Sequence, residues 1–303
     1  MYNSLNIVNV RKTIQEYVYD LKRRLAARND RVNAIEWLIN NIHFSPLFAH
    51  WIEQSLYTSE TIFEEAINDA VRYNHLSVIK IIYKYKEKLG LSFNYKLCIN
   101  IAASSGYIDI IEWFYNRSSK ERLIKANLDI TTNPIIPFNY NELALEWAAS
   151  NGTIESIQWF FDHREELPFI CSNHVINLAA GRAYIHILDW FYEHSDYVPF
   201  EYDSYAIDTA ADKGLLQVLD WFFDHSNELW VQTHYLKSKR VLQFKHSENA
   251  MFWASINDFI HILQWFVNHI PKDNLRYDKE QSIAGATKYN NIDIVNWWHN
   301  SDL

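Results

Sequence analysis

The feature that most constrains the fold is a short stretch of sequence that recurs around a tryptophan. The clearest copy is AASNGTIESIQWFFDH, which runs from Ala148 to His163. Three close copies begin at Ala102, Ala179 and Ala210, and four weaker ones begin at Ala26, Ala70, Ala254 and Ala286. A unit this short cannot enclose its own apolar residues, so eight copies in series predict that neighbouring units stack on one another.

The spacing of the units separates a basic period from insertions. The residues in the tryptophan position, which we term anchors, are Trp37, Ile81, Trp113, Trp159, Trp190, Trp221, Trp265 and Trp297. Four of the seven intervals are 31 or 32 residues long, and the other three are 44 to 46. A phenylalanine stands 21 residues before four of the tryptophans, at Phe138, Phe169, Phe200 and Phe244. The extra residues enter before this phenylalanine, which predicts insertions near 42–60, 117–136 and 226–243. The insertion at 117–136 is the most polar, and we expect it to be a flexible loop.

Each unit has the pattern of two helices joined by a turn. In the clearest copy, Ile154, Ile157 and Trp159 fall on one stripe of a helix, as apolar residues that face a core do. Ala148 belongs to a preceding helix, where small side chains allow the backbones of neighbours to approach. Gly152 lies between the two helices, where a residue that can adopt a left-handed conformation is expected.

The predicted fold is therefore all-α, a solenoid of about eight helix–turn–helix repeats that forms one domain over residues 1–303. Within it, residues 1–25 are expected to supply an N-terminal capping helix, from roughly Lys12 to Leu25.

The repeat pattern Ala-Ala-x-x-Gly-x-Ile-x-x-Ile-x-Trp-Phe resembles the ankyrin repeat, whose core runs Ala-Ala-x-x-Gly-His-Leu-x-Ile-Val-x-x-Leu-Leu and whose period is about 33 residues. The resemblance spans about residues 20–300, although the family's Thr-Pro-Leu-His opening is replaced by stretches such as NELALEW. Shortened, tryptophan-rich repeats in a glycine-poor chain are similar to those of giant viruses of amoebae and some protists. The resemblance implies a viral interaction protein whose repeats are of the ankyrin type.

Acidic residues beside histidines, as in WFFDH at 159–163 and 221–225, raise the alternative of a catalytic or metal site. Adjacent side chains on a helix do not face each other, so Asp162 and His163 cannot form a dyad. Histidines in equivalent positions of stacked helices lie roughly 8–10 Å apart, too far to share a zinc ion that needs ligands at about 2 Å. A histidine in the last turn of a helix can bond a terminal carbonyl instead. We therefore predict no catalytic residues, no metal, no cofactor and no enzymatic activity.

Composition narrows the expected partners and location. The net charge is 28 − 37 = −9, which argues against general nucleic-acid binding because phosphates require an excess of basic residues. No apolar run reaches the length of a membrane span, and we see no signal peptide. The two cysteines, Cys98 and Cys171, are expected to be buried thiols of a reducing compartment. The chain is expected to be cytoplasmic, with no membrane and no nucleic acid among its partners.

We therefore expect a non-catalytic protein–protein interaction module or scaffold, whose partner the sequence does not identify. The ankyrin resemblance implies that the partner binds the concave surface and contacts the residues between the alanine pair and the glycine. The candidate partner-binding residues are Arg28, Asn29, Arg72, Tyr73, Ser104, Ser105, Ser150, Asn151, Arg182, Asp212, Lys213, Asn257, Lys288 and Tyr289. Two alternatives stay open: a substrate-receptor subunit of an enzyme such as a ubiquitin ligase, and a structural component of a virion.

Overall fold

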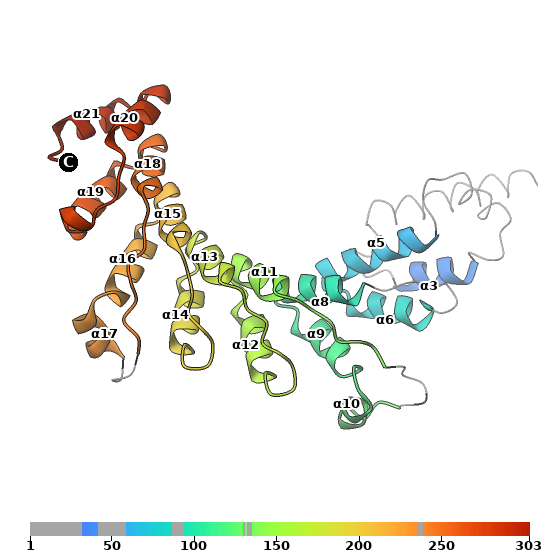
Figure 1. The fold of residues 1–303 in the computed structure, drawn as a ribbon. Helices are drawn as coiled ribbons and strands as arrows, with labels where there is room; N and C mark the ends of the chain where they lie inside the picture. Colours follow the sequence, from blue (N-terminus) through green and yellow to red (C-terminus); the bar gives the residue numbers. More distant parts are fainter. Residues whose placement is uncertain (1–31, 42–58, 87–93, 130, 132–134, 236–238) are drawn as a thin grey trace, which may run out of the picture. The chain divides into compact units, whose positions relative to one another are not determined.

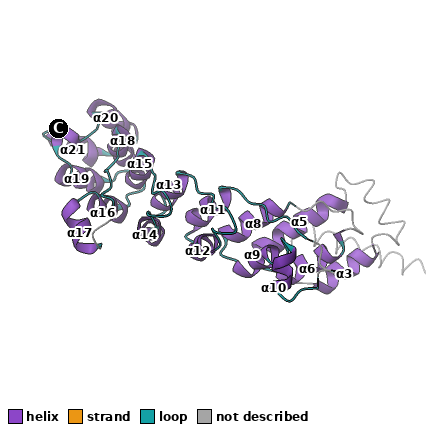
Figure 2. Cartoon of the chain, turned by 60° about the horizontal axis from the view of Figure 1, so that its bottom comes forward, coloured by secondary structure: helices purple, strands orange, loops and turns teal. Residues whose placement is uncertain are grey.

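The computed structural model describes residues 32–41, 59–86, 94–129, 131, 135–235 and 239–303. Throughout these ranges the regular structure is helical, and they contain no strand (Figures 1 and 2). The chain forms two compact units, one of Met1–Trp147 with Glu155–Pro168 and the other of Ala148–Ile154 with Phe169–Leu303. The prediction of all-α structure is confirmed, whereas the extent of the repeat domain over 1–303 stays a prediction.

The first unit contains most of the amino-terminal helices. They are α3 (Val32–Asn41), α5 (Ser59–Arg72), α6 (Leu76–Lys84), α8 (Tyr95–Ser104), α9 (Ile108–Tyr115) and α10 (Lys120–Lys125). Helices α11 (Leu143–Asn151) and α12 (Ile154–Asp162) cross the division between the units. Helix α5 packs against α6 and α8, and α8 packs against α9, so a pair of helices is the element that repeats here.

The second unit continues with the same kind of helix pair. Its helices are α13 (His174–Ala180), α14 (Ile185–Glu193), α15 (Ser204–Asp212), α16 (Leu216–His225), α17 (Glu228–His234), α18 (Glu248–Ile256), α19 (Ile260–His269), the short 3₁₀ helix η1 (Lys272–Asn274), α20 (Lys279–Lys288) and α21 (Ile292–Asn300). The first helices of successive pairs, α13, α15, α18 and α20, pack side by side in one layer. Each also packs against its own second helix, α14, α16, α19 or α21.

The turn inside each pair places one residue in the left-handed region. The predicted position Gly152 has φ of +74°, and Gly106 and Gly214 occupy the same place in their units. Four units place another residue type at this position with positive φ, at Asn74, Ala183, Asp258 and Asn290. After the turn, the backbone N–H of Tyr107 donates to the carbonyl of Ala102, which satisfies an end of the first helix.

The anchor tryptophans form the core, as the stripe predicts. Trp113, Trp159, Trp190, Trp221 and Trp265 are all buried, and the phenylalanine that follows each of them is completely enclosed. The loop phenylalanines that stand 21 residues earlier pack against the same indoles. Phe200 lies 5.8 Å from Trp221 between ring centroids, for example, and Phe244 lies 5.7 Å from Trp265.

The histidines four residues after the tryptophans belong to this core arrangement. The rings of His163, His194 and His225 stack on their tryptophans with centroids 3.8–4.1 Å apart. Each Nδ1 lies 2.7–2.8 Å from the main-chain carbonyl of the same tryptophan, so Nδ1 carries a hydrogen that it donates. The prediction that these histidines bond terminal carbonyls is confirmed. Arg117 takes the equivalent position after Trp113, with its guanidinium 4.5 Å from the indole and Nη1 donating to the Trp113 carbonyl.

A second hydrogen bond joins the tryptophan of one repeat to the repeat before it. Trp221 Nε1 donates to Asp189 Oδ1 at 2.7 Å, and Trp265 Nε1 donates to Asp220 Oδ1 at 2.6 Å. Trp159 makes the same bond to Glu112. In every case the acceptor is the residue immediately before the preceding anchor. The acidic residue at that position therefore serves the next repeat in all three cases, and Glu112 also accepts a hydrogen bond from Asn116 of its own repeat.

The long insertions and the short loops are closed by the same main-chain hydrogen bond. In the short loops, the N–H of Leu167 donates to the carbonyl of His163, and Val198 donates to His194. In the long loops, the corresponding donors are Ile136, to Arg117, and Leu242, to His225. The same pair of repeat positions therefore closes a loop of any of these lengths.

The expectation of a flexible loop at 117–136 is wrong for the described part of this insertion. It folds into helix α10, whose Leu123 is completely buried. The Arg122 guanidinium lies 4.2 Å from the ring of Tyr115 and bonds the Glu166 carboxylate at 3.1 Å. The insertion at 226–243 likewise forms α17, with Val231 buried. Each of these two insertions therefore contributes a buried apolar side chain from its own helix, although the sequence of 117–136 is polar.

Some predictions concern residues outside the described ranges. These are the capping helix within 1–25, the insertion near 42–60 up to residue 58, and the candidate residues Arg28 and Asn29. Of the cysteines, Cys98 is buried as expected, whereas Cys171 is only half-buried.

Candidate partner-binding surface

The candidate residues within the described ranges lie where the first helix of each pair ends, directly before the left-handed turn. Solvent reaches most of them: Arg72, Tyr73, Asn151, Arg182, Lys213, Asn257, Lys288 and Tyr289 are exposed, and Ser104, Ser105, Ser150 and Asp212 are half-buried. The structure thus places the sequence-predicted positions at helix ends that a partner can reach.

In the second unit the candidates from successive pairs are brought together. The Nζ of Lys213 donates to the Gly181 carbonyl at 2.6 Å, next to Arg182. Asn257 Nδ2 donates to both the main-chain and carboxylate oxygens of Asp212, at 2.9 and 2.8 Å. Lys213 and Asn257 therefore also hold neighbouring repeats together, a role that the sequence pattern did not reveal. Arg182 has no such bond to a neighbouring repeat among the described residues.

In the first unit the end of α5 is built in a similar way. Arg72 pairs with the buried carboxylate of Asp69 at 3.6 Å, and its main-chain carbonyl accepts a hydrogen bond from the Tyr107 hydroxyl. The ring of Tyr73 is 43% exposed. Ser104 and Ser105 follow at the end of α8, which packs beside α5.

Two aromatic residues on this layer were not among the candidates. Tyr205 on α15 is 60% exposed and Trp253 on α18 is 42% exposed. Tyr205 lies seven residues before Asp212, and Trp253 lies four before Asn257, so each shares a helix face with a candidate residue. The helical period applied backwards from the candidates would have identified both. Together with Tyr289, which is 57% exposed, they form what we term the aromatic face of the second unit.

The most perturbed titratable groups lie in the interior instead. Burial lowers the pKa of His246 to about 4, and the positive charge of Arg276 acts in the same direction. Burial raises the pKa of Tyr140 to about 12, and its hydroxyl donates to the Pro168 carbonyl. Burial also raises the pKa of Asp208, opposed by hydrogen bonds from Ser247, the residue that caps α18. All of these groups bond the loop or helix start of the next repeat, so their perturbation reflects packing.

The Asp–His pairs do not form dyads in this arrangement. His163 directs Nδ1 to the Trp159 carbonyl, whereas the adjacent Asp162 accepts a hydrogen bond from Gln158 at 2.8 Å. The described residues contain no group of three or more His, Cys, Asp or Glu side chains placed to hold a metal ion. None of the described helices combines the length and apolar character that a bilayer crossing requires.

Comparison with known proteins adds no assignment. No family model matches the chain, and no curated protein matches it either.

Proposed function

We propose that this chain is an all-α solenoid of degenerate ankyrin-like repeats that binds a partner protein and has no catalytic role. The partner contacts the layer of first helices, which corresponds to the concave side in the ankyrin family. The ankyrin assignment and the viral source in this proposal rest on the sequence resemblance, and the cytoplasmic location is a separate expectation from composition and cysteine usage.

The repeat geometry supports the ankyrin-like part of the proposal. The left-handed turn, the anchor tryptophan and its stacked histidine recur at constant positions in the helix pairs of the second unit up to α19. Bonds between equivalent positions of successive units, such as Trp221 to Asp189, are what a nearest-neighbour stack requires.

The aromatic face carries the binding part of the proposal. Exposed tryptophan and tyrosine side chains dominate the binding energy of many protein interfaces, because they bury a large area and lose little side-chain entropy. Tyr205 and Trp253 lie on the neighbouring helices α15 and α18, and Tyr289 directly follows α20, with basic Arg182, Lys213 and Lys288 at the ends of α13, α15 and α20. Exposed aromatic side chains bordered by basic groups suit a partner surface that has apolar and acidic residues.

Affinity purification from cells of the native host, followed by mass spectrometry, tests this function. The wild-type chain is compared with a Tyr205→Ser, Trp253→Ser, Tyr289→Ser triple variant. Tyr197→Ser serves as the control, because Tyr197 is 71% exposed but lies in the loop after α14. Circular dichroism verifies that each variant keeps its helical content.

We expect at least one protein to bind the wild type and the Tyr197 variant and to be lost with the triple variant. Direct titration with that protein, once purified, should reproduce the difference. Ubiquitin-ligase subunits among such proteins favour the substrate-receptor alternative, and capsid proteins favour the virion alternative. An identical set of proteins for the wild type and the triple variant would contradict the assignment of the binding face.

A further inference from the structure

Trp297, the anchor of the last repeat, lacks the surroundings of the other described tryptophan anchors in the second compact unit. The ring of Trp265, one unit earlier, contacts Phe223 at 5.7 Å, Phe244 at 5.7 Å and its own His269 at 4.5 Å. At the positions equivalent to these three aromatic residues, the last unit has Val267, Arg276 and Ser301. Among the described residues, the one aromatic neighbour of the Trp297 ring is Trp298, at 5.0 Å.

The acceptor for the indole N–H is missing as well. Asp220 accepts the hydrogen bond from Trp265, but the equivalent residue one unit later is Gln264, which makes no such bond in the described structure. Trp297 is consequently half-buried, whereas the next residue, Trp298, is fully enclosed and donates to Ser255 Oγ at 2.8 Å.

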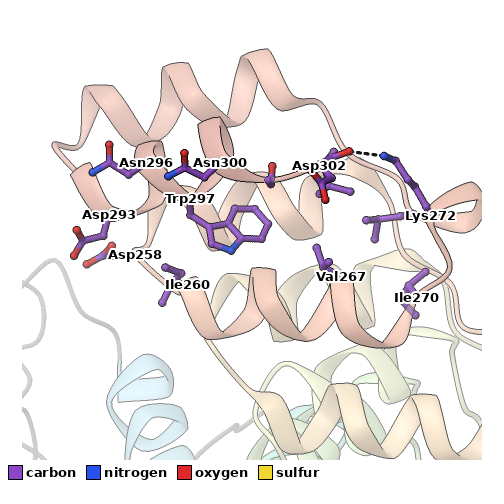
Figure 3. Close-up of a pocket in the computed structure, with 13 residues that line it drawn as sticks. Asp258, Ile260, Val267, Ile270, Lys272, Asp293, Asn296, Trp297, Asn300 and Asp302 are labelled. Carbon is purple, nitrogen blue, oxygen red and sulfur yellow. Dashed lines mark hydrogen bonds between the residues drawn. The ribbon is translucent and has the colours of Figure 1, made fainter.

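A cavity of about 740 Å³ takes the place of the missing groups between α19 and α21. Figure 3 shows the Trp297 indole directed from α21 toward α19, where Ile260 and Val267 line the opposite side. Val267 is 42% exposed, so the apolar lining is open to solvent. A groove with this lining accepts an apolar side chain and the flat face of a planar group.

The charged groups of the cavity lie at its two ends. The carboxylates of Asp258 and Asp293 lie at the same end in Figure 3, and neither has an ion-pair partner within the described residues. At the opposite end, Lys272 donates to the main-chain oxygen of Asp302. Asn296 and Asn300, one turn apart on α21, line the side between the two ends. Their amides have the donors and acceptors that bind a peptide backbone.

We propose that this cavity, which we term the Trp297 groove, binds a short peptide segment of a partner in which a basic residue stands next to an apolar one. A basic side chain lies against Asp258 and Asp293, and the apolar residue packs on Trp297 and Val267. The chain itself contains an example of the pairing, because the Arg117 guanidinium lies on the ring of Trp113 where other units have a histidine. The groove lies between second helices, so it is separate from the aromatic face.

The experiment uses the full chain labelled with ¹⁵N at its tryptophan indoles. The indole resonance of Trp297 is assigned from its loss in Trp297→Phe. Two synthetic peptides are titrated, acetyl-Ala-Arg-Leu-Arg-Ala-amide and, as the matched acidic probe, acetyl-Ala-Glu-Leu-Glu-Ala-amide. We expect a saturable shift of the Trp297 resonance with the arginine peptide and none with the glutamate peptide.

The charge requirement is tested by the double variant Asp258→Asn, Asp293→Asn. It should weaken binding of the arginine peptide by roughly threefold to tenfold, the range for two exposed ion pairs. Asp273→Asn makes the same kind of charge change on exposed η1, outside the groove, and should leave the affinity unchanged. The triple variant of the aromatic face should also bind the peptide normally, which distinguishes failure of this site from failure of the proposed function.

Three results would overturn the proposal. The first is no shift of Trp297 with millimolar arginine peptide, and the second is an equal shift with the glutamate peptide. The third is equal weakening by Asp273→Asn and by the double variant, since binding would then follow net charge alone.

Discussion

Trp221 and Trp297 occupy the same position in two units of the chain and have different surroundings. Trp221 stacks on His225 at 3.8 Å and on Phe200 at 5.8 Å, contacts Tyr192 of the preceding unit, and donates to Asp189. Trp297 has none of these groups at the equivalent positions and lines an open groove. The difference shows that an anchor tryptophan at an equivalent repeat position can be a core residue or line a groove, depending on the neighbours that the surrounding positions supply.

The largest expected difference is in the cost of removing each tryptophan. Trp221→Ala should lower the free energy of unfolding by about 3–5 kcal/mol, because it leaves a cavity in a closed core. Trp297→Ala removes a half-buried ring and should cost only about 1–2 kcal/mol. Urea unfolding followed by circular dichroism measures both. Equal costs would mean that the groove around Trp297 is closed in solution.

Acid should lower the free energy of unfolding through protonation of His246. The ring of His246 lies 5.3 Å from that of Phe266 between centroids, and its Nε2 accepts a hydrogen bond from the main-chain N–H of Arg276. Its pKa is about 4 in the folded chain against 6.5 for an ordinary histidine, so the unfolded chain binds more protons between these values. Stability contributed by the neutral ring is therefore present above pH 6.5 and is lost as the pH falls toward 4. Near pH 5 the loss should reach about 2 kcal/mol relative to pH 8.

The variant His246→Gln keeps an acceptor for Arg276 and removes the titrating group. Its stability, measured by urea unfolding between pH 8 and pH 5, should decline less steeply than that of the wild type. Exposed His261→Gln is the control and should leave the pH profile unchanged. Parallel profiles for the wild type and His246→Gln would show that protonation of His246 does not oppose folding.

The hydrogen bond between units is tested by an equivalent pair of residues. Asp220→Ala leaves the Trp265 indole N–H without its acceptor and should cost about 1 kcal/mol. Gln264→Ala, the same position one unit later, should cost close to nothing, because Trp297 makes no bond there. Thermal unfolding of the two variants against the wild type measures the difference. A similar cost for both would show that this position stabilises its own helix rather than the next unit.

The smallest expected effect is a gain in stability at Trp113, the anchor of the third repeat. Within the described part of the chain, Trp113 Nε1 is buried without a hydrogen-bond partner. The residue before the preceding anchor is Lys80, which cannot accept. Lys80→Glu should therefore stabilise the chain by about 0.5–1 kcal/mol. Lys80→Met removes the charge without adding an acceptor, so it should give no gain in the same urea titration.

Much of the local structure could be read from the sequence. The period of the apolar stripe located the second helix of the clearest unit, the paired alanines indicated the helix before it, and Gly152 marked the turn between them. The constant sequence separation of Phe200 from Trp221 located the insertions, and the structure adds that the two rings are in contact. These predictions succeed because helix period, turn conformation and a repeated spacing depend on residues that are close in the sequence or recur at fixed intervals.

The contacts between repeats could not be predicted from the sequence in the same way. The bonds of Asp220 to Trp265 and of Lys213 to Gly181 join residues more than thirty positions apart, and side chains alone do not reveal which unit they serve. The polar sequence of 117–136 indicated a loop, but the burial of a single residue, Leu123, makes α10 part of the core. Apolar surface is buried one side chain at a time, so one residue can outweigh a polar segment.

The sequence by itself therefore determined the repeating unit, its helices and its turn, because these follow from local propensity and periodicity. Only the tertiary structure decided which copies are fully enclosed, because enclosure depends on residues that neighbouring units supply. Trp221 and Trp297 are equivalent in the repeat, yet one is core and the other lines a groove. The helical period places Tyr205 and Trp253 on the face of the candidate residues, but the packing of the first helices decides that they are exposed.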